Sequence, residues 1–324
     1  MKFTLFDRPT GDNPATAMVL ILCGVMLLGL QDSLVKFISS DTSFWQFQSL
    51  RAAANIVLLI TVCAIGGTFR LMIPINRTAV FIRALVLMAC MFCFFGGAPS
   101  LSVAQMATGL YTYPIFITLM AGPVLGETIG KWRIFAVLLG SAGALTILRP
   151  WADSFTPVQI LPIFAGFFYA INVMIVRRYC RGESPIALTL AVAIVFLASG
   201  IAGITLLNLF PLPLSVQLAV PFIAVGWPTL TVMIVTFVVI ASFLNLFGNI
   251  CLSRAYQTAE SSRLAPLDFS YLLFAALWSK ILFDTWPTFF TLIGMALIAC
   301  AGMLTAWREH VSDRLAKVEA IASS

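Results

Sequence analysis

Residues 18–38 read MVLILCGVMLLGLQDSLVKFI, an apolar run interrupted only at Gln31–Ser33 and at Lys36. A helix of about 20 apolar residues crosses the hydrocarbon core of a bilayer. Similar runs recur along the 324 residues, of which 60% are hydrophobic and 10% charged, with a mean hydropathy of +1.01. Soluble proteins carry about 25% charged residues. The sequence therefore predicts an integral membrane protein with a single membrane domain.

Ten runs are long enough to span the membrane. Each is continuously apolar, whereas strands of a membrane barrel would alternate and measure only about ten residues. The predicted fold is all-α, a polytopic membrane protein with about ten transmembrane helices. The spans are expected at 18–38, 44–65, 78–97, 101–124, 132–148, 158–176, 186–209, 227–252, 264–283 and 286–306.

Basic residues in the connections indicate the orientation, because Lys and Arg accumulate in cytoplasmic loops. The loops on the other side of the membrane contain few basic residues, chiefly Arg149 and Lys280. An even number of spans with both termini in the cytoplasm fits this asymmetry. The expected location is the cell membrane, multi-pass, which is the inner membrane in a Gram-negative bacterium. The basic loops contain Arg70, Arg77, Lys131, Arg133, Arg177, Arg178, Arg181, Arg254, Arg263, Arg308, Arg314 and Lys317.

The two ends of the chain are expected outside the bilayer. Residues 1–17 form a cytoplasmic N-terminal segment, and the first span follows it without a small-residue cleavage site, so we expect a retained span and not a signal peptide. Residues 307–324 form a cytoplasmic tail whose charged and apolar residues alternate at helical spacing, which predicts an exposed or membrane-surface helix.

Composition excludes several classes of protein. The net charge of +6 is dispersed between apolar runs, so a nucleic acid is not an expected partner. The seven cysteines lack the spacing of a disulfide framework or zinc site, and apolar residues surround the Cys90-x-x-Cys93 pair. We expect no metal and no cofactor.

A carrier is favoured over the two alternatives, a membrane-embedded enzyme and a channel. The only histidine, His310, lies in the polar tail, which removes the base or ligand that serine and zinc proteases need. Asp32 and Asp268 are expected near opposite surfaces and cannot form an aspartyl dyad. No filter or charge ring of a channel is present. The chain is predicted to be no enzyme but a secondary carrier working by alternating access.

An internal repeat is expected, since many carriers consist of two inverted halves. Residues 104–127 align without gaps on 261–284, so that Leu-Gly-Glu at 125–127 falls on Leu-Phe-Asp at 282–284. The repeats are predicted at 18–148 and 149–306. Small residues in the fifth and tenth spans favour close helix packing: Gly140, Gly143, Ala144, Gly294, Ala299 and Gly302.

The sequence resembles the drug/metabolite transporter superfamily, in particular its ten-span EamA-type members. The resemblance rests on Tyr-Pro-Ile-Phe at 113–116, the Leu-Gly-Glu motif and the stretch RAYQTAESSRLAPLDFS at 254–270, and the segment 294–304 adds to it. Asp32 with Lys36, and Gln48 with Arg51, also resemble the subgroup of S-adenosylmethionine and riboflavin uptake carriers. Phe283-Asp284 departs from the Gly-Glu that family members usually repeat. The resemblance implies a cavity lined by spans one, three, four, six, eight and nine.

Three ionisable residues lie within predicted spans, where a charge is costly unless it is paired or hydrated. Asp32 and Lys36 share a helix face, and Arg51 lies at the depth of Asp32 on the adjacent antiparallel helix. We expect one charge cluster that binds substrate or gates the outer side. The alternative is a buried ion network that only packs spans one and two.

A second pair, Arg83 and Asp268, lies near the cytoplasmic surface and could close an inner gate. The alternative is that Arg83 extends to the membrane interface by itself.

Polar aromatic and amide side chains on the cavity helices are the remaining candidates for substrate contact. Asn245 and Asn249 share one face and either bind the substrate or join two helices. Pro114 and Pro266 are candidate hinges. These groups favour an amphipathic organic substrate with a ring, such as an amino acid, a riboflavin-like compound or an S-adenosylmethionine-like compound, with coupling to a proton or ion compatible with this class. The candidates are Gln105, Tyr111, Tyr113, Tyr169, Asn172, Asn245, Asn249, Tyr271 and Trp278.

Overall fold

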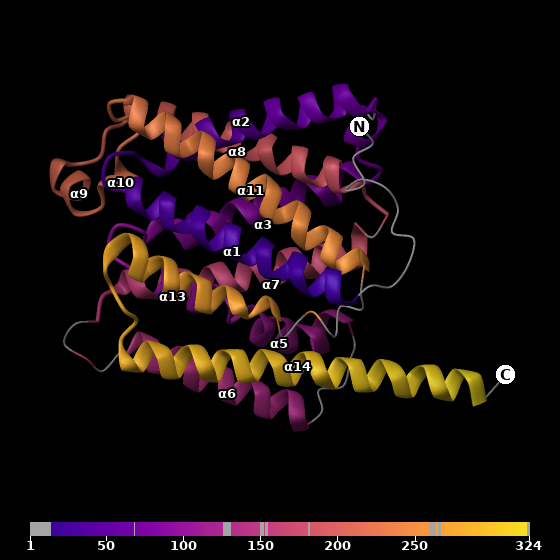
Figure 1. Ribbon diagram of the computed structural model, residues 1–324. Coiled ribbons are helices and arrows are strands. Elements are labelled where there is room, and N and C mark those ends of the chain that lie inside the picture. The colour runs from indigo at the N-terminus through magenta and orange to yellow at the C-terminus, as the bar shows by residue number, and fades with distance from the viewer. Residues whose placement is uncertain are drawn as a thin grey trace. The chain divides into compact units, whose positions relative to one another are not determined.

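The computed structural model describes residues 14–67, 69–125, 131–149, 152, 155–180, 182–258, 264 and 267–322. Every regular element within these ranges is a helix, and no strand occurs among them (Figure 1). The all-α prediction is confirmed for this part of the chain. Glu127 and Gly126 of the Leu-Gly-Glu motif, and Pro266, lie outside the described residues.

The chain divides into two compact units, and each takes segments from both halves of the sequence. Unit 1 consists of residues 1–30, 114–155 and 244–324, and unit 2 of residues 31–113 and 156–243. Two long helices, α1 (Pro14–Ile38) and α11 (Val232–Thr258), contribute their two ends to different units.

Unit 2 contains most of the long apolar helices. These are α2 (Phe44–Gly66), α3 (Arg77–Gly96), α7 (Leu161–Tyr179) and α8 (Pro185–Leu209), and the unit also holds the short α4 (Val103–Leu110). Helix α2 packs along α8, and α3 packs on both α7 and α8. The approach of α2 and α8 is close, because a Cβ atom added at Gly200 would lie 3.0 Å from the Trp45 carbonyl oxygen.

Short helical segments complete the connections of unit 2. These are η1 (Phe69–Met72), η2 (Pro157–Ile160), α9 (Leu214–Ala219) and α10 (Pro221–Ala224). The connection that holds α9 and α10 is fixed to the start of α2 by three hydrogen bonds. Ser43 donates to the Gly226 carbonyl oxygen at 2.7 Å, Trp45 to that of Ile223 at 2.8 Å, and Gln46 to that of Pro228 at 2.9 Å.

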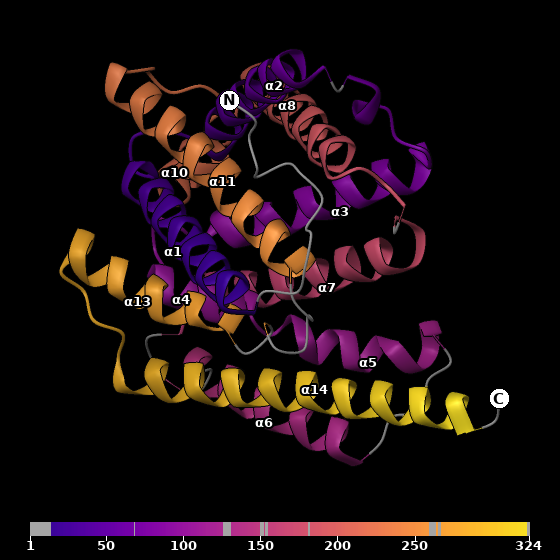
Figure 2. The ribbon, with the colours of Figure 1, turned by 45° about the vertical axis from the view of Figure 1, so that its right-hand side comes forward.

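Unit 1 is built around two antiparallel neighbours. Helix α6 (Lys131–Leu148) packs along α14 (Phe289–Ala322), and both ribbon views show them side by side (Figures 1 and 2). A Cβ added at Gly143 would lie 3.0 Å from the Gly294 carbonyl oxygen, and one added at Gly294 would lie 2.7 Å from that of Gly143. These two glycines therefore have the packing role that their spacing predicts. Unit 1 also holds α13 (Ser270–Phe283) and, from Pro114 on, α5 (Tyr113–Leu125).

Among the described residues, six helices are long and apolar enough to cross a membrane, by length and composition. They correspond to the predicted spans one, two, three, six, seven and eight. Shorter apolar helices at Ile134–Leu148, Ser270–Phe283 and Phe289–Leu304 coincide with the predicted fifth, ninth and tenth spans. The chain is a multi-pass membrane protein.

The sequence predicts the fourth span as one continuous helix, and the structure shows two. It consists of α4 and α5, which are separated at Tyr111 and Thr112. Pro114 explains the break, because proline lacks the backbone N–H that would continue the hydrogen bonds of α4 and is tolerated in the first turn of a new helix.

The eighth span starts later and ends later than predicted. Residues 227–231, which include Pro228, are not helical, and α11 begins at Val232, where the Thr231 hydroxyl accepts a hydrogen bond from the Ile234 backbone N–H at 3.3 Å. The tenth span also begins later, at Phe289, and the helix continues without interruption through the predicted tail to Ala322.

Candidate functional site

Arg51 lies inside unit 2 with only 4% of its surface exposed. Three phenylalanine rings surround its guanidinium carbon, with ring centroids at 5.0 Å for Phe47, 5.9 Å for Phe95 and 5.8 Å for Phe196. The Asp32 carboxylate acts electrostatically on the same guanidinium. Unit 2 thus brings together two of the three residues of the predicted charge cluster.

Lys36, the third residue of that cluster, is directed toward backbone oxygens. Its ammonium donates to the carbonyl oxygens of Ala98 at 2.8 Å and Leu101 at 2.6 Å. Both oxygens belong to the connection that follows α3, so Lys36 joins the end of α1 to this connection. Carbonyl oxygens can solvate a cation in the absence of water, and the contact gives Lys36 a structural role in this conformation.

Gln48 lies three residues before Arg51 on α2 and is fully buried. Its Oε1 and Nε2 atoms both lack a hydrogen-bond partner among the described residues. Gln46, equally buried on the same helix, has partners at both atoms, since Thr42 donates to Oε1 at 2.7 Å and Nε2 donates to Pro228. A buried amide without any partner is rare in proteins, so Gln48 joins the candidate site.

Gln48 is not among the site residues that the sequence predicts. The signal was available, because an amide one helical turn from an arginine within an apolar run is a polar pair on one helix face.

A second group of polar side chains in unit 2 lies where the end of α4 and the next residues, up to Tyr113, pack on α7. Tyr113 packs against Tyr111 with ring centroids 6.0 Å apart and against Tyr169 at 5.0 Å, both edge to face. Asn172 lies one turn after Tyr169, is 5% exposed and has no hydrogen-bond partner at Oδ1 among the described residues. These four predicted site residues therefore belong to one polar aromatic cluster.

Arg83 on α3 belongs to the same unit. Its Nη1 atom donates to the Leu188 carbonyl oxygen at 3.4 Å, and Tyr169 and Cys180 act on it electrostatically. Asp268 belongs to unit 1, and its pairing with Arg83 as an inner gate stays a prediction.

Gln105 has a local structural role. With Ser102 it forms a capping box at the start of α4: the Gln105 Oε1 atom accepts from the Ser102 N–H at 2.9 Å, and the Ser102 hydroxyl accepts from the Gln105 N–H at 3.2 Å. Its amide oxygen is thus occupied by the helix N-terminus, whose free N–H groups need such acceptors.

The other candidates lie in unit 1. The Trp278 indole donates to the Met26 carbonyl oxygen at 3.1 Å and joins α13 to α1, while Tyr271 is buried on the same helix. Asn249 donates to the Asn245 carbonyl oxygen of its own helix at 2.8 Å and is exposed. This hydrogen bond within α11 therefore occupies one of the two amide donors of Asn249 on the face that it shares with Asn245.

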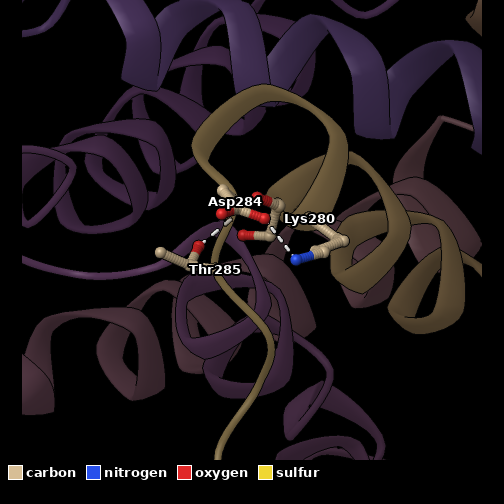
Figure 3. A network of polar contacts seen from close by, with 4 residues as sticks. Lys280, Asp284 and Thr285 are labelled. Carbon is tan, nitrogen blue, oxygen red and sulfur yellow. Dashed lines mark hydrogen bonds and ion pairs between the residues drawn. The ribbon is translucent and has the colours of Figure 1, made fainter.

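Asp284, where the chain departs from the usual Gly-Glu motif, ends α13. Figure 3 shows its carboxylate paired with Lys280 one turn earlier, while the Thr285 hydroxyl donates to the Ser279 carbonyl oxygen at 3.3 Å. Asp284 has a left-handed backbone conformation, with φ of 51°, which closes the helix. The hydrogen bond and charge of Lys280 lower the pKa of this exposed carboxyl group. This residue forms a helix end.

Comparison with known proteins adds a family to these observations. Residues 15–149 match the EamA-like transporter family. A riboflavin transporter of Vibrio cholerae is 28% identical over 207 residues, which are 63% of each chain. A riboflavin transporter of Rhizobium johnstonii is 25% identical over 67% of this chain and 66% of its own length. The match thus spans just under two thirds of these two relatives.

Two further proteins are similar to this chain. An S-adenosylmethionine uptake transporter of Rickettsia bellii is 25% identical over 64% of this chain and 66% of its own length. A crystal structure at 16% identity covers 90% of this chain and 98% of its own with a TM-score of 0.52, which shows a shared fold. The domain at residues 15–149 belongs to the EamA-like transporter family.

Proposed function

We propose that the protein is a secondary carrier that moves a small organic metabolite across the cell membrane by alternating access. The observation that carries the proposal is Arg51, which is buried in an apolar helix among three phenylalanine rings, with the unpartnered amide of Gln48 one turn away. Ionisable groups inside a membrane are costly and mark substrate or ion pathways. The relatives named as transporters of riboflavin and of S-adenosylmethionine support the same class of activity.

The substrate class follows from the groups gathered in unit 2. The four-residue cluster of Tyr111, Tyr113, Tyr169 and Asn172, together with the aromatic surroundings of Arg51, suits an organic molecule with a ring. Residues Asn245, Asn249, Tyr271 and Trp278 of unit 1 remain proposed substrate contacts. Arg83 and Asp268 remain the proposed inner gate.

The proposed architecture is ten spans in two inverted repeats, 18–148 and 149–306, with both termini in the cytoplasm. If spans n and n+5 are equivalent, α2 corresponds to α8 and α6 to α14, and the members of both pairs pack on each other. The same relation makes α1 equivalent to α7, and α3 equivalent to α11. The contact of α7 with α3 therefore has its counterpart in the contact of α1 with α11, where a Cβ at Gly24 would lie 3.0 Å from the Gly248 carbonyl oxygen. The contact of α7 with α4 corresponds likewise to the Trp278–Met26 contact of α13 with α1. These matched contacts support the repeat.

Transport by purified protein in sealed vesicles tests the carrier proposal. Riboflavin, S-adenosylmethionine and aromatic amino acids are offered separately, and we expect saturable uptake of at least one of them. Passage of inorganic ions without uptake of any organic solute would replace the carrier by a channel.

A further inference from the structure

The unpartnered amide of Gln48 limits which chemical groups can bind beside it. Oε1 accepts and Nε2 donates, and both atoms are buried without partners among the described residues. The groups that complete this amide must therefore donate to Oε1 and accept from Nε2. A carboxylate can satisfy Nε2 alone, because it has no N–H or O–H to offer Oε1.

Arg51 supplies the next donors on the same face of α2, since residues three apart on a helix are neighbours. The rings of Phe47, Phe95 and Phe196 lie 5.0 to 5.9 Å from its guanidinium carbon. The N–H groups of a guanidinium lie in its plane and point outward from its edge. Apart from the electrostatic attraction of Asp32, these ring contacts are the interactions of the Arg51 side chain among the described residues.

The local charges favour an uncharged ligand group. Asp32 already opposes the charge of Arg51, and two carbonyl oxygens already solvate the ammonium of Lys36. A ligand carboxylate would bring a second negative charge close to Asp32 in a medium of low dielectric constant.

We propose that Gln48 and Arg51 recognise the uncharged imide edge of a flat heteroaromatic ring, an N–H group flanked by two carbonyl oxygens. Gln48 Oε1 accepts from the ring N–H, Gln48 Nε2 donates to one carbonyl oxygen, and the Arg51 guanidinium donates to the other. The neighbouring phenylalanine rings supply apolar faces for the ring. The inference rests on the proposed carrier function and names the substrate class of that site.

Gln48 is closed off from solvent in this conformation, so the ring binds after the helices around α2 separate. Alternating access supplies such a step, because the site opens to one side of the membrane at a time. The unpartnered amide makes the empty closed form less favourable than the loaded one.

The test uses riboflavin, which carries an imide edge, and 3-methylriboflavin, in which a methyl group replaces the imide hydrogen. Uptake is measured with the full-length protein in vesicles. We expect the wild type to prefer riboflavin about tenfold or more, the range for a buried hydrogen bond lost with its partner left unpaired. The variant Gln48→Met removes the amide at nearly the same size, and we expect it to transport both compounds at similar rates.

Gln46→Met is the matched control, because Gln46 is equally buried on α2 but already has protein partners. We expect this variant to lose thermal stability and keep its preference for riboflavin. Gln48→Met should instead keep or gain stability, since it removes an unsatisfied buried group.

Three results would overturn the inference: equal uptake of both flavins by the wild type, a preference that survives in Gln48→Met, or no uptake of riboflavin at all. The carrier proposal fails separately, and only if S-adenosylmethionine and the aromatic amino acids are not transported either.

Discussion

Arg51 shows how a permanent charge can be kept inside an apolar helix. Aromatic faces attract a cation through their quadrupole, and Arg51 has three such rings within 6 Å of its guanidinium carbon. Asp32 adds the opposite charge. Neither contribution by itself replaces the hydration that the guanidinium loses on burial, so Arg51 and Asp32 should depend on each other.

Removing either member of this pair should therefore destabilise the protein. We expect Asp32→Asn or Arg51→Gln alone to cost about 3 to 5 kcal/mol, because each leaves a buried charge uncompensated. The double variant should cost less than the sum of the two. Unfolding in detergent, followed by tryptophan fluorescence, measures the three values.

The double variant also separates the two roles of the pair. A folded double variant without transport indicates that the pair binds substrate or gates. Full transport would reduce it to helix packing, and strictly additive losses would mean that the two residues do not interact.

The sequence predicted the charged residues of this cluster but not the group that Lys36 contacts. Helical spacing brings Asp32 and Lys36 onto one face, whereas the carbonyl oxygens of Ala98 and Leu101 lie in a connection whose path no local pattern specifies. The local role of Gln105 can be predicted from the sequence, because Ser102-x-x-Gln105 has the spacing of a capping box. Its contact with substrate stays a prediction.

At the scale of elements, the contact of α6 with α14 depends on small residues. In Gly143→Val the first added carbon would lie 2.9 Å from Ile298 Cγ1 and 3.0 Å from both the Gly294 carbonyl oxygen and Leu297 Cβ. A backbone oxygen cannot rotate away as a side chain can, so the helices must separate. We expect a loss of about 1 to 3 kcal/mol, the usual range for overpacking, measured by thermal unfolding in detergent.

Gly182→Val is the control for this substitution, because a Cβ at Gly182 meets no atom within 4 Å. It should leave the melting temperature nearly unchanged. Equal effects of the two substitutions would contradict the packing role of Gly143.

The end of α13 should make a small pH-dependent contribution to stability. Lys280 lowers the pKa of the Asp284 carboxyl from its ordinary value of 3.8, so protons bind more weakly in the folded state. The contribution is present above pH 3.8 and is lost as the pH falls through the lower folded value. Asp284→Asn should lower the melting temperature slightly at pH 6, and this difference should shrink as the pH falls well below 3.8. A difference that persists there would mean that the charge is not responsible.

The apolar runs predicted the existence of the long helices because burial in lipid forces every backbone group into an intrahelical hydrogen bond. Their interruptions were harder to predict. Pro114 and Pro228 were visible as helix breakers, yet hydropathy continues smoothly through both positions and hides the break after Leu110 and the late start of α11.

At the scale of the whole molecule, the basic loops predict the orientation. We expect a C-terminal fusion to a phosphatase that is active only outside the cytoplasm to be inactive, and a fusion within residues 149–157 to be active. The enzyme activity of cells that carry each fusion measures this directly. The reverse pattern would invert the orientation and with it the proposed sides of both gates.

Sequence order predicted two consecutive repeats, whereas the compact units combine segments from both halves. Hydropathy assigns a residue to a helix but carries no information about which helix becomes its neighbour. The pairing of α2 with α8 depends on close approach at Gly200, and that of α6 with α14 on Gly143 and Gly294. Such contacts between distant residues appear only in the folded chain.

The uninterrupted course of α14 has a mechanical consequence. Its 34 residues measure about 51 Å at 1.5 Å per residue, against about 30 Å for the hydrocarbon core. Residues 305–322 therefore form a rod of about 27 Å beyond the apolar segment. A fluorescent protein fused to this rod would stand off from the bilayer at a fixed distance and would report any tilt of α14 as a change in energy transfer to labelled lipids.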